Sequence, residues 1–593
     1  MNVRRVILPA STALVLSLAC ADDSTSSTSQ ADLGDGDSEG ITTNDGPESG
    51  EAETTGDGDG DGDGDGDGDG DGDGDGDGDG DGDGDGDGDG DGDGDGDGDG
   101  DGDGDGDPCG AVCCPRATQC NGDVSEVCNE DGSAWVPQEV CDPIQGSSCN
   151  ANSGTCEGAC SAGALGLSYI GCDYYPTVTQ QEDFYDDVPN QFAVTVANVS
   201  AAPANITITR GGNNISNAVV QPGAVDVIPL PWISQLTAGT GPSVLVQDGA
   251  YRLRSDQPVV VYQYNPINAT VTNDASILLP VNAWGPEVVV ASWYYWPTYN
   301  YPGFYAVVAS EDNTTVNLYP SATGGNVQAG GGVAADGTGQ VVLNNSDVLQ
   351  VLNSSGDLTG TLISADKPIQ VIGGHECSNV PLNIVACDHL EESIYPLQTL
   401  ADEYFVVPPV QVPNTNALKA TIVRVIATED NTQITFSPDQ GQNQVLASRG
   451  DFLEIPMTTN AFKVTGDKDI LVVQYMVGQA ANYGTSDPAM LLAVPIAQYR
   501  DNYLFYAEPN WTANFVDIIA PNNTAVTVDG IAVNGWTGIG ATGYSVAHVQ
   551  LSNNGNGRHE VDASDKVGIS VYGVLNYGSY WYPGGLDLAI NPQ

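Results

Sequence analysis

The chain has 593 residues and a formal net charge of −66, from 81 acidic and 15 basic side chains. The acidic excess persists outside the N-terminal tract, because the part from Asp173 onward holds 38 acidic and 12 basic residues. Such a surface repels the phosphates of nucleic acids and the headgroups of anionic lipids, so we expect neither as a partner.

Residues 1–20 have the features of an export signal. Two arginines precede the apolar run Val6–Leu18, which is too short to span a bilayer as a mature helix. The stretch Leu16–Cys20 resembles the lipobox at which bacterial lipoproteins are cleaved and acylated. We therefore predict an exported lipoprotein, held at the bacterial outer membrane or cell surface by a lipid anchor on Cys20. Cleavage to an unanchored secreted protein is the alternative.

Residues 21–107 are predicted to form a disordered acidic linker. Gly56–Asp107 consists of 26 uninterrupted Gly-Asp pairs without an apolar side chain, so nothing offsets the entropy lost on ordering. A neutral coil of this length would span roughly 40 Å, and charge repulsion extends it further. An EF-hand calcium site needs Glu at position 12, where this repeat always has Gly. Loosely bound calcium is the most that we expect here.

Residues 108–172 hold ten of the 13 cysteines. So short a segment buries too small a core to fold without cross-links, and an exported protein meets oxidising conditions, which predicts a disulfide-rich module. Zinc binding by the thiols is the alternative, but the segment has no histidine. The module resembles short Cys-rich modules of exported myxobacterial proteins.

Residues 173–593 read as strands that are separated by Asn, Asp, Gly and Pro turns, without a long helical period. Two strand-turn-strand elements recur at intervals of about 90 to 120 residues, which indicates four repeated units. The first element lies at Gln191–Ile208, Phe304–Tyr319, Ala420–Phe436 and Asn514–Val528, and the second at Tyr251–Tyr264, Leu362–Gly374, Phe462–Tyr475 and His559–Gly573. The predicted fold class is all-β, with β-sandwich-like units packed together; a β-propeller-like ring is the alternative.

The stretch Gly373–Pro409 contains Gly-His and Cys, then Cys-Asp-His-Leu, an acidic pair and an aromatic-Val-Val-Pro strand. This order resembles the N-terminal domain family of IgGFc-binding protein. The SDKP-type turns expected at Ser255–Pro258 and Ala365–Pro368 are similar to that family as well. The resemblance implies an extracellular binding role.

Cys377 and Cys387 are the only cysteines after residue 172, and we predict that they form a disulfide. They are flanked symmetrically by His375 and His389, so the bridge would bring two imidazoles and two carboxylates together. These groups could bind a single transition metal, zinc or copper. The alternative is that each imidazole bonds to loop carbonyls.

An unusually dense aromatic run lies before the second unit. Aromatic rings provide contact area at a low entropic cost, so we predict a surface for an extracellular protein or glycan. Packing over sheet edges is the alternative. The candidate residues are Trp293, Tyr294, Tyr295, Trp296, Tyr299, Tyr301 and, near the C-terminus, Trp581.

The predicted function is adhesion or recognition at the cell surface, without catalysis and without an essential cofactor. An enzyme that acts on extracellular polysaccharide is the alternative, because carboxylates and aromatic residues are abundant. No catalytic residue can be assigned, since the sequence shows no paired-carboxylate motif of the kind that glycoside hydrolysis needs.

Overall fold

A computed structural model describes residues 112–182, 191–237, 241–267, 272–322 and 324–589, which belong to one compact unit, Asp101–Gln593. The predicted lipid anchor Cys20, the linker 21–107 and its calcium hypothesis lie outside the described residues. The described part is all-β, as predicted, and no helix in it is long and apolar enough to cross a membrane.

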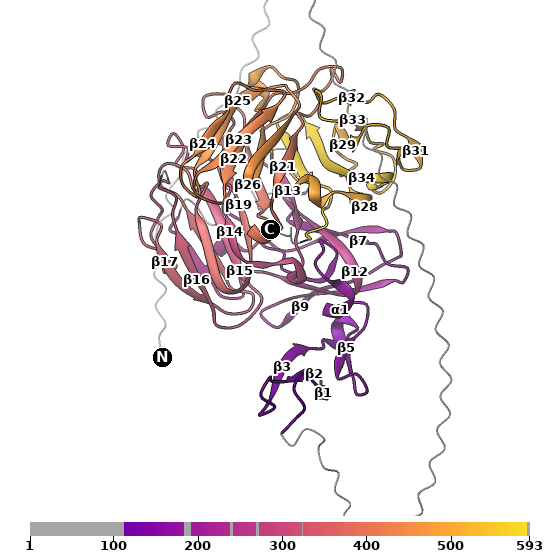
Figure 1. Ribbon diagram of the computed structural model, residues 1–593. Coiled ribbons are helices and arrows are strands. Elements are labelled where there is room, and N and C mark those ends of the chain that lie inside the picture. Colours follow the sequence, from indigo (N-terminus) through magenta and orange to yellow (C-terminus); the bar gives the residue numbers. More distant parts are fainter. Residues whose placement is uncertain (1–111, 183–190, 238–240, 268–271, 323, 590–593) are drawn as a thin grey trace, which may run out of the picture. The chain divides into compact units, whose positions relative to one another are not determined.

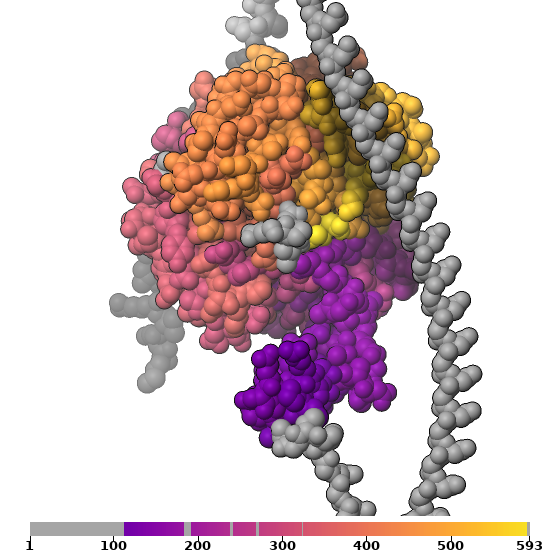
Figure 2. All heavy atoms as spheres, viewed as in Figure 1, coloured from indigo at the N-terminus to yellow at the C-terminus, as the bar shows by residue number. Residues whose placement is uncertain are grey.

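The disulfide-rich module has little regular structure and is held by cross-links. Its elements are β1 (Thr118–Asn121), β2 (Val124–Cys128), β3 (Trp135–Val140), η1 (Pro143–Gln145), β4 (Ser148–Asn150), β5 (Thr155–Glu157) and α1 (Ala162–Leu165). Disulfides join Cys113 to Cys128, Cys120 to Cys149, Cys141 to Cys156 and Cys160 to Cys172. Cys172 lies on the first strand of the large β domain, so the last bridge ties the module to that domain. An ion pair between Arg254 and Asp142 (Nη1–Oδ2 3.1 Å) adds a second contact, and Figure 2 shows the module against the first unit.

Four repeated units follow along the chain, and Figure 1 shows them in sequence colours from purple to yellow. Unit 1 contains β6 (Gly171–Tyr174), β7 (Ala193–Asn198), β8 (Ala204–Arg210), β9 (Asn213–Val220), β10 (Val225–Pro229), α2 (Ser234–Thr237), β12 (Arg252–Asn265) and β13 (Asp274–Leu278). Unit 2 contains β11 (Val244–Val246), η2 (Val281–Ala283), β14 (Gly285–Val289), β15 (Gly303–Ala309), β16 (Thr314–Tyr319), β17 (Gly339–Leu343), β18 (Val348–Leu352), β19 (Leu362–Asn379) and β20 (Cys387–Ser393). Unit 3 contains η3 (Leu397–Thr399), β21 (Ala401–Val406), β22 (Thr421–Ala427), β23 (Thr432–Ser437), β24 (Gln444–Leu446), β25 (Phe452–Thr458), β26 (Phe462–Met476), η4 (Gln479–Ala481) and β27 (Met490–Leu492). Unit 4 contains η5 (Ile496–Gln498), β28 (Arg500–Tyr506), β29 (Ala513–Pro521), β30 (Val526–Val528), β31 (Ile531–Ala532), β32 (Thr537–Gly538), β33 (Tyr544–Gln550), β34 (Arg558–Leu575) and β35 (Gly578–Pro583).

Each unit is built on one long bent strand, namely β12, β19, β26 or β34. In β26 the first half pairs with β21 and β23, whereas the second half pairs with β22 and β27. The long strand therefore belongs to two packed sheets, which makes each unit sandwich-like, as predicted.

The bend in each long strand is a bulge, and in two of these strands it lies at a segment that the sequence led us to expect as a turn. Ser255–Pro258 and Ala365–Pro368 lie inside the continuous strands β12 and β19, at a shift of register. The acidic residue of each segment caps a neighbouring strand: Asp366 accepts a bond from the Thr315 backbone N–H (2.7 Å). An extra unpaired stretch bends a strand without ending it, so the turn prediction was wrong.

The innermost strands β13, β20, β27 and β35 bring the four units together. Each contacts the next, and β35 contacts β13, so the sandwich-like units close into a ring. These strands are buried on both faces, and apolar residues fill the interior between the units.

Candidate binding face

One end of the ring gathers most of the residues that the sequence analysis singled out. The long strands finish at this end, and the innermost strands begin there, because the two run antiparallel. We call the connecting segments at this end the loop face; their described parts include residues 290–302, 380–386, 407–420, 477–489, 507–512 and 576–577.

An aromatic hairpin lies on the loop face between β14 and β15. The backbone N–H and C=O groups of Trp296 and Tyr301 bond to each other (2.9 and 3.2 Å) and close the hairpin. The Trp296 ring lies 4.7 Å from Tyr299, which stacks 5.6 Å from Tyr301. Tyr299 is 56% exposed, while Tyr295 is partly exposed and donates to Asn300. The structure thus brings three of the predicted surface residues into one ring cluster.

Trp293 and Trp581 do not belong to this surface, which corrects the prediction. Both side chains are buried, and the Trp293 indole N–H donates to the Asn379 carbonyl (3.1 Å). Trp581 lies on the innermost strand β35, where both faces are covered by other units. A dense aromatic run can therefore begin in the core and emerge at the surface a few residues later.

Arg424 on β22 fixes the base of the aromatic hairpin to unit 3. Its guanidinium carbon lies 4.2 Å from the Trp293 ring and 4.6 Å from the partly buried Tyr294 ring. The buried side chain also pairs with Asp357 (2.9 Å) and Glu454 (3.0 Å). Cation–π contacts and ion pairs that are this well desolvated hold a ring in one orientation. The sequence analysis missed Arg424; its signal is one arginine between apolar residues in a β-branched strand.

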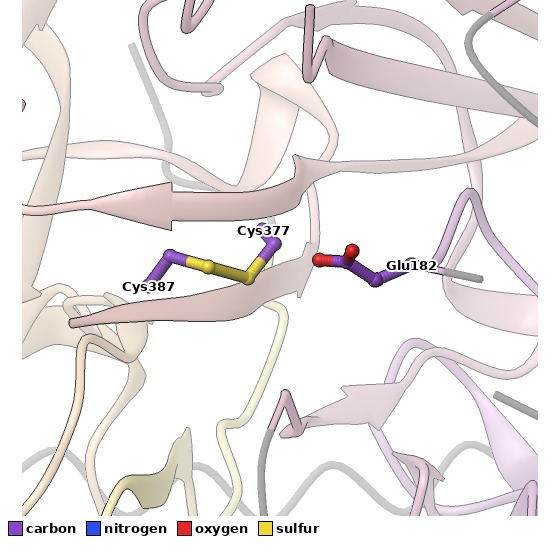
Figure 3. A group of neighbouring side chains, drawn as sticks. All are labelled: Glu182, Cys377 and Cys387. Carbon is purple, nitrogen blue, oxygen red and sulfur yellow. A yellow bond between two sulfur atoms is a disulfide. The ribbon is translucent and has the colours of Figure 1, made fainter. Parts of the chain in front are cut away.

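A second contact of the hairpin, through Glu182, lies beside a disulfide. Cys377 and Cys387 are joined, which is the pairing expected from the sequence. Glu182 lies beside this bridge, with a carboxylate oxygen within 4.8 Å of the sulfurs (Figure 3), and accepts a hydrogen bond from the Tyr301 hydroxyl. These three residues meet a metal-ligand spacing, but sulfurs that are bonded to each other are not thiolate ligands. Of the three, Glu182 bonds directly to the hairpin, through Tyr301.

His375 and His389 lie beneath the disulfide, and both are fully buried. His389 is 3.2 Å from the Glu376 carbonyl through Nδ1 and 3.1 Å from the Asn265 amide through Nε2. Burial, together with the nearby His389, lowers the pKa of His375 to about 3, so its imidazole is neutral. Zinc or copper at this histidine pair stays a prediction, which elemental analysis of a His375→Ala, His389→Ala double variant would test.

Two aspartates under the loop face link the units. The sequence analysis missed Asp274, and it considered Asp388 only as one of the two carboxylates near the disulfide. Asp274 accepts backbone N–H bonds from its own strand and from the other three innermost strands; the donors are Ala275 (2.9 Å), Glu391 (3.2 Å), Met490 (3.0 Å) and Trp581 (3.0 Å). Asp388 accepts in the same way from Asn273, His389 and Ser579. Burial raises the pKa of Asp274, and these N–H donors oppose that shift. The sequence signal that could have identified Asp274 is an acidic residue at the start of an apolar strand.

Sequence comparisons relate the chain to known proteins. The family model described as IgGFc binding protein matches residues 274–573, about half of the chain. The chain belongs to this family. It is 24% identical to human IgGFc-binding protein over 395 residues, which cover 65% of this chain and 7% of that protein. Two B repeat units of the collagen-binding protein of Staphylococcus aureus match at 9% identity, over 69% of this chain and 98% of theirs, with a TM-score of only 0.08.

Proposed function

We propose that this protein is an exported recognition protein that binds an extracellular protein or glycan through its loop face. The observation that carries the proposal is the aromatic hairpin, a cluster of one exposed ring (Tyr299) and partly exposed rings that Arg424 and Glu182 hold in place. Rigid aromatic side chains lose little entropy when they bind, so they suit a recognition surface. Membership in the IgGFc-binding protein family supports an extracellular binding role.

The N-terminal third would display this domain. In the proposal, lipid on Cys20 anchors the chain, residues 21–107 act as a spacer, and the module at residues 108–172 is a cross-linked neck before the β domain at residues 173–593. Fractionation of the native host tests the anchor: a Cys20→Ser variant should move from the membrane fraction to the soluble exported fraction. An unchanged distribution would contradict lipid anchoring.

Binding is tested with the full chain on glycan and protein arrays, followed by affinity measurement on the best ligand. Tyr299→Ala should weaken binding at least tenfold, which corresponds to about 1.4 kcal/mol. Tyr319→Ala is the matched control, because Tyr319 is 52% exposed and pairs with Leu362 at the opposite end of β19. Equal affinity of the Tyr299 variant and wild type would place the ligand elsewhere.

The alternative function, hydrolysis of a polysaccharide, needs two suitably spaced carboxyl groups in a cleft, and Glu560 with Asp562 is one pair that can be tested against this requirement. A cleft of about 450 Å³ is lined by Glu560, Asp562 and Tyr169. Burial and then the charge of the neighbouring Glu560 raise the pKa of Asp562, and a hydrogen bond between the two carboxyl groups raises it further. Glycosidases separate their carboxyl groups by about 5 to 9.5 Å, so this pair is too close to hold a sugar or water between them. We therefore favour recognition over hydrolysis.

A further inference from the structure

The Cys377–Cys387 disulfide joins two strands that are already paired. Asn379 of β19 lies opposite Cys387 of β20, and Ser378 lies opposite Asp388. The bridge spans ten residues, which is the shortest separation among the five disulfides described. A cross-link that closes a short loop restricts the unfolded chain least, and strand pairing by itself holds the two Cα atoms close together, 5.3 Å apart. The two sulfurs would therefore remain neighbours without the bond between them.

A carboxylate faces this bridge. One oxygen of Glu182 and the two sulfurs all lie within 4.8 Å of one another, and Figure 3 shows the carboxylate pointing toward the disulfide. The hydroxyl of Tyr301 donates a hydrogen bond to this carboxylate, but a disulfide has no proton to donate. Cys377 is buried, whereas Cys387 is partly exposed. A reagent from the solvent can therefore reach the bridge at a point where an anionic oxygen waits beside it.

The spacing of the three atoms is close to that of zinc ligands. Zinc binds thiolates at about 2.3 Å and carboxylate oxygens at about 2.0–2.2 Å, so a tetrahedron of such ligands has roughly 3.4–3.8 Å between its corners. The oxygen and the sulfurs already meet within 4.8 Å. Small rotations of the side chains reach the tetrahedral spacing once the sulfurs are no longer bonded to each other.

The two histidines beneath the disulfide do not belong to this set. Both ring nitrogens of His389 lie within hydrogen-bond distance of other groups, namely the Glu376 carbonyl (3.2 Å) and the Asn265 amide (3.1 Å). Among the described residues, the cluster with ligand spacing contains Glu182 and the two cysteines but neither histidine. A zinc ion here would take three ligands from the protein and a water molecule as the fourth.

We propose that reduction of the Cys377–Cys387 disulfide creates a zinc site, formed by the two thiolates and Glu182. A dithiol supplies two electrons and two protons: it is oxidised to its own disulfide, while the S–S bond of the protein breaks and each sulfur becomes a thiol. Zinc then displaces the two thiol protons and forms two Zn–S bonds and one Zn–O bond. Oxidation of the thiolates back to the disulfide releases the ion. The ion lies one hydrogen bond away from the aromatic hairpin, through the contact between Glu182 and Tyr301.

Zinc retention by the full chain tests the site. The chain is reduced with a phosphine, which adds no thiol, and is loaded with zinc after the phosphine has been removed without oxygen. Elemental analysis after desalting should find one more zinc ion in reduced wild type than in a reduced Cys377→Ser, Cys387→Ser double variant. Oxidised wild type should lack this ion. Equal retention by reduced wild type and the double variant, or by the reduced and oxidised wild type, would overturn the proposal.

A matched variant accounts for the disulfide-rich module, whose bridges are reduced as well. A Cys141→Ser, Cys156→Ser double variant removes the same number of thiols from a bridge inside the module. It should keep the additional zinc ion. Circular dichroism of each reduced variant verifies that the β structure is retained. Loss of the ion from this variant as well would assign zinc to the module and overturn the proposal.

A Glu182→Gln variant tests the carboxylate ligand. The amide oxygen can still accept the bond from Tyr301, but it carries no charge for the metal. In competition with a chromogenic zinc chelator, the affinity of the reduced chain should fall by roughly tenfold or more, since even changes to residues behind a metal ligand cost that much. Cobalt in place of zinc reports the thiolates, through a sulfur-to-cobalt absorption band that should be stronger in wild type than in the Cys377, Cys387 double variant. Unchanged zinc affinity of Glu182→Gln would contradict the three-ligand site.

Discussion

Replacing Asp274 by asparagine should destabilise the whole ring. The change keeps the size of the side chain but replaces one carboxylate oxygen with an NH2 group. Two of the four backbone N–H groups, which come from β13, β20, β27 and β35, would then face a donor. The carbonyl oxygen of asparagine can accept only the other two.

The expected loss follows from these contacts. Each buried N–H without an acceptor costs about 1–3 kcal/mol, so two of them, before relaxation, give a loss of about 2–6 kcal/mol. A typical domain has only about 5–15 kcal/mol of stability, so the variant should unfold at a clearly lower urea concentration. Tryptophan fluorescence during urea unfolding measures this, because Trp581 lies on the affected strand β35.

A matched control separates this effect from any Asp→Asn change. Asp467 is exposed and accepts a single backbone bond from Gln433 (2.8 Å), which asparagine can still accept. Asp467→Asn should therefore remain within about 1 kcal/mol of wild type. If Asp274→Asn were equally mild, Asp274 would have to be protonated in the folded state. The four N–H bonds would then not be what joins the units.

Three further predictions concern the supports of the loop face and unit 4. Arg424→Met should lower the free energy of unfolding by about 3–5 kcal/mol in urea titrations, because Asp357 loses its buried partner. Converting Cys377 and Cys387 to serine should lower it by about 3 kcal/mol on the chain-entropy model; a loss below 1 kcal/mol would contradict that estimate. Burial lowers the pKa of His548, but the buried carboxylate of Asp517 (Nδ1–Oδ1 2.7 Å) outweighs it and leaves the pKa above its ordinary value. Since the folded pKa is raised, this stabilisation is complete below the unfolded pKa of about 6.5 and is lost as the pH rises through the folded value. Urea titrations at pH 6 and pH 9 should show a larger decline for wild type than for His548→Gln.

Sequence reasoning reached the all-β class, the four units and the Cys377–Cys387 pairing because these depend on local signals. The strands show within short segments of the sequence, and their recurrence shows when such segments are compared along the chain. Closure of the ring, in contrast, depends on contacts between segments that are far apart in the sequence. Strand β11 lies between strands of unit 1 in the sequence yet pairs with β18 of unit 2. The pairing of β11 with another unit depends on contacts between distant segments, and the spacing of residues along the sequence does not predict it.

The errors at the candidate site have the same origin. The innermost strands are covered on both faces, so Trp581 carries no pattern that separates a core residue from a surface one. Trp293 was misplaced because its partner, Arg424, is more than a hundred residues away in another unit. A repeated signal did exist and went unused: each of the first three innermost strands runs into a proline and a short 3-10 helix, at Pro280, Pro396 and Pro495.

The proposed binding surface is a property of the assembled ring. Its hairpin belongs to unit 2, its cationic support Arg424 belongs to unit 3, and Glu182 lies ahead of β7 in unit 1. Unit 2 alone would lack both of these supports, and its hairpin would lose the contacts that fix its rings. A mobile side chain must be ordered when the ligand binds, which costs entropy. Rings that are already fixed therefore bind at a lower entropic cost. Recognition and ring closure are therefore coupled, and substitutions on the ring axis, far from the exposed rings, should weaken binding along with stability.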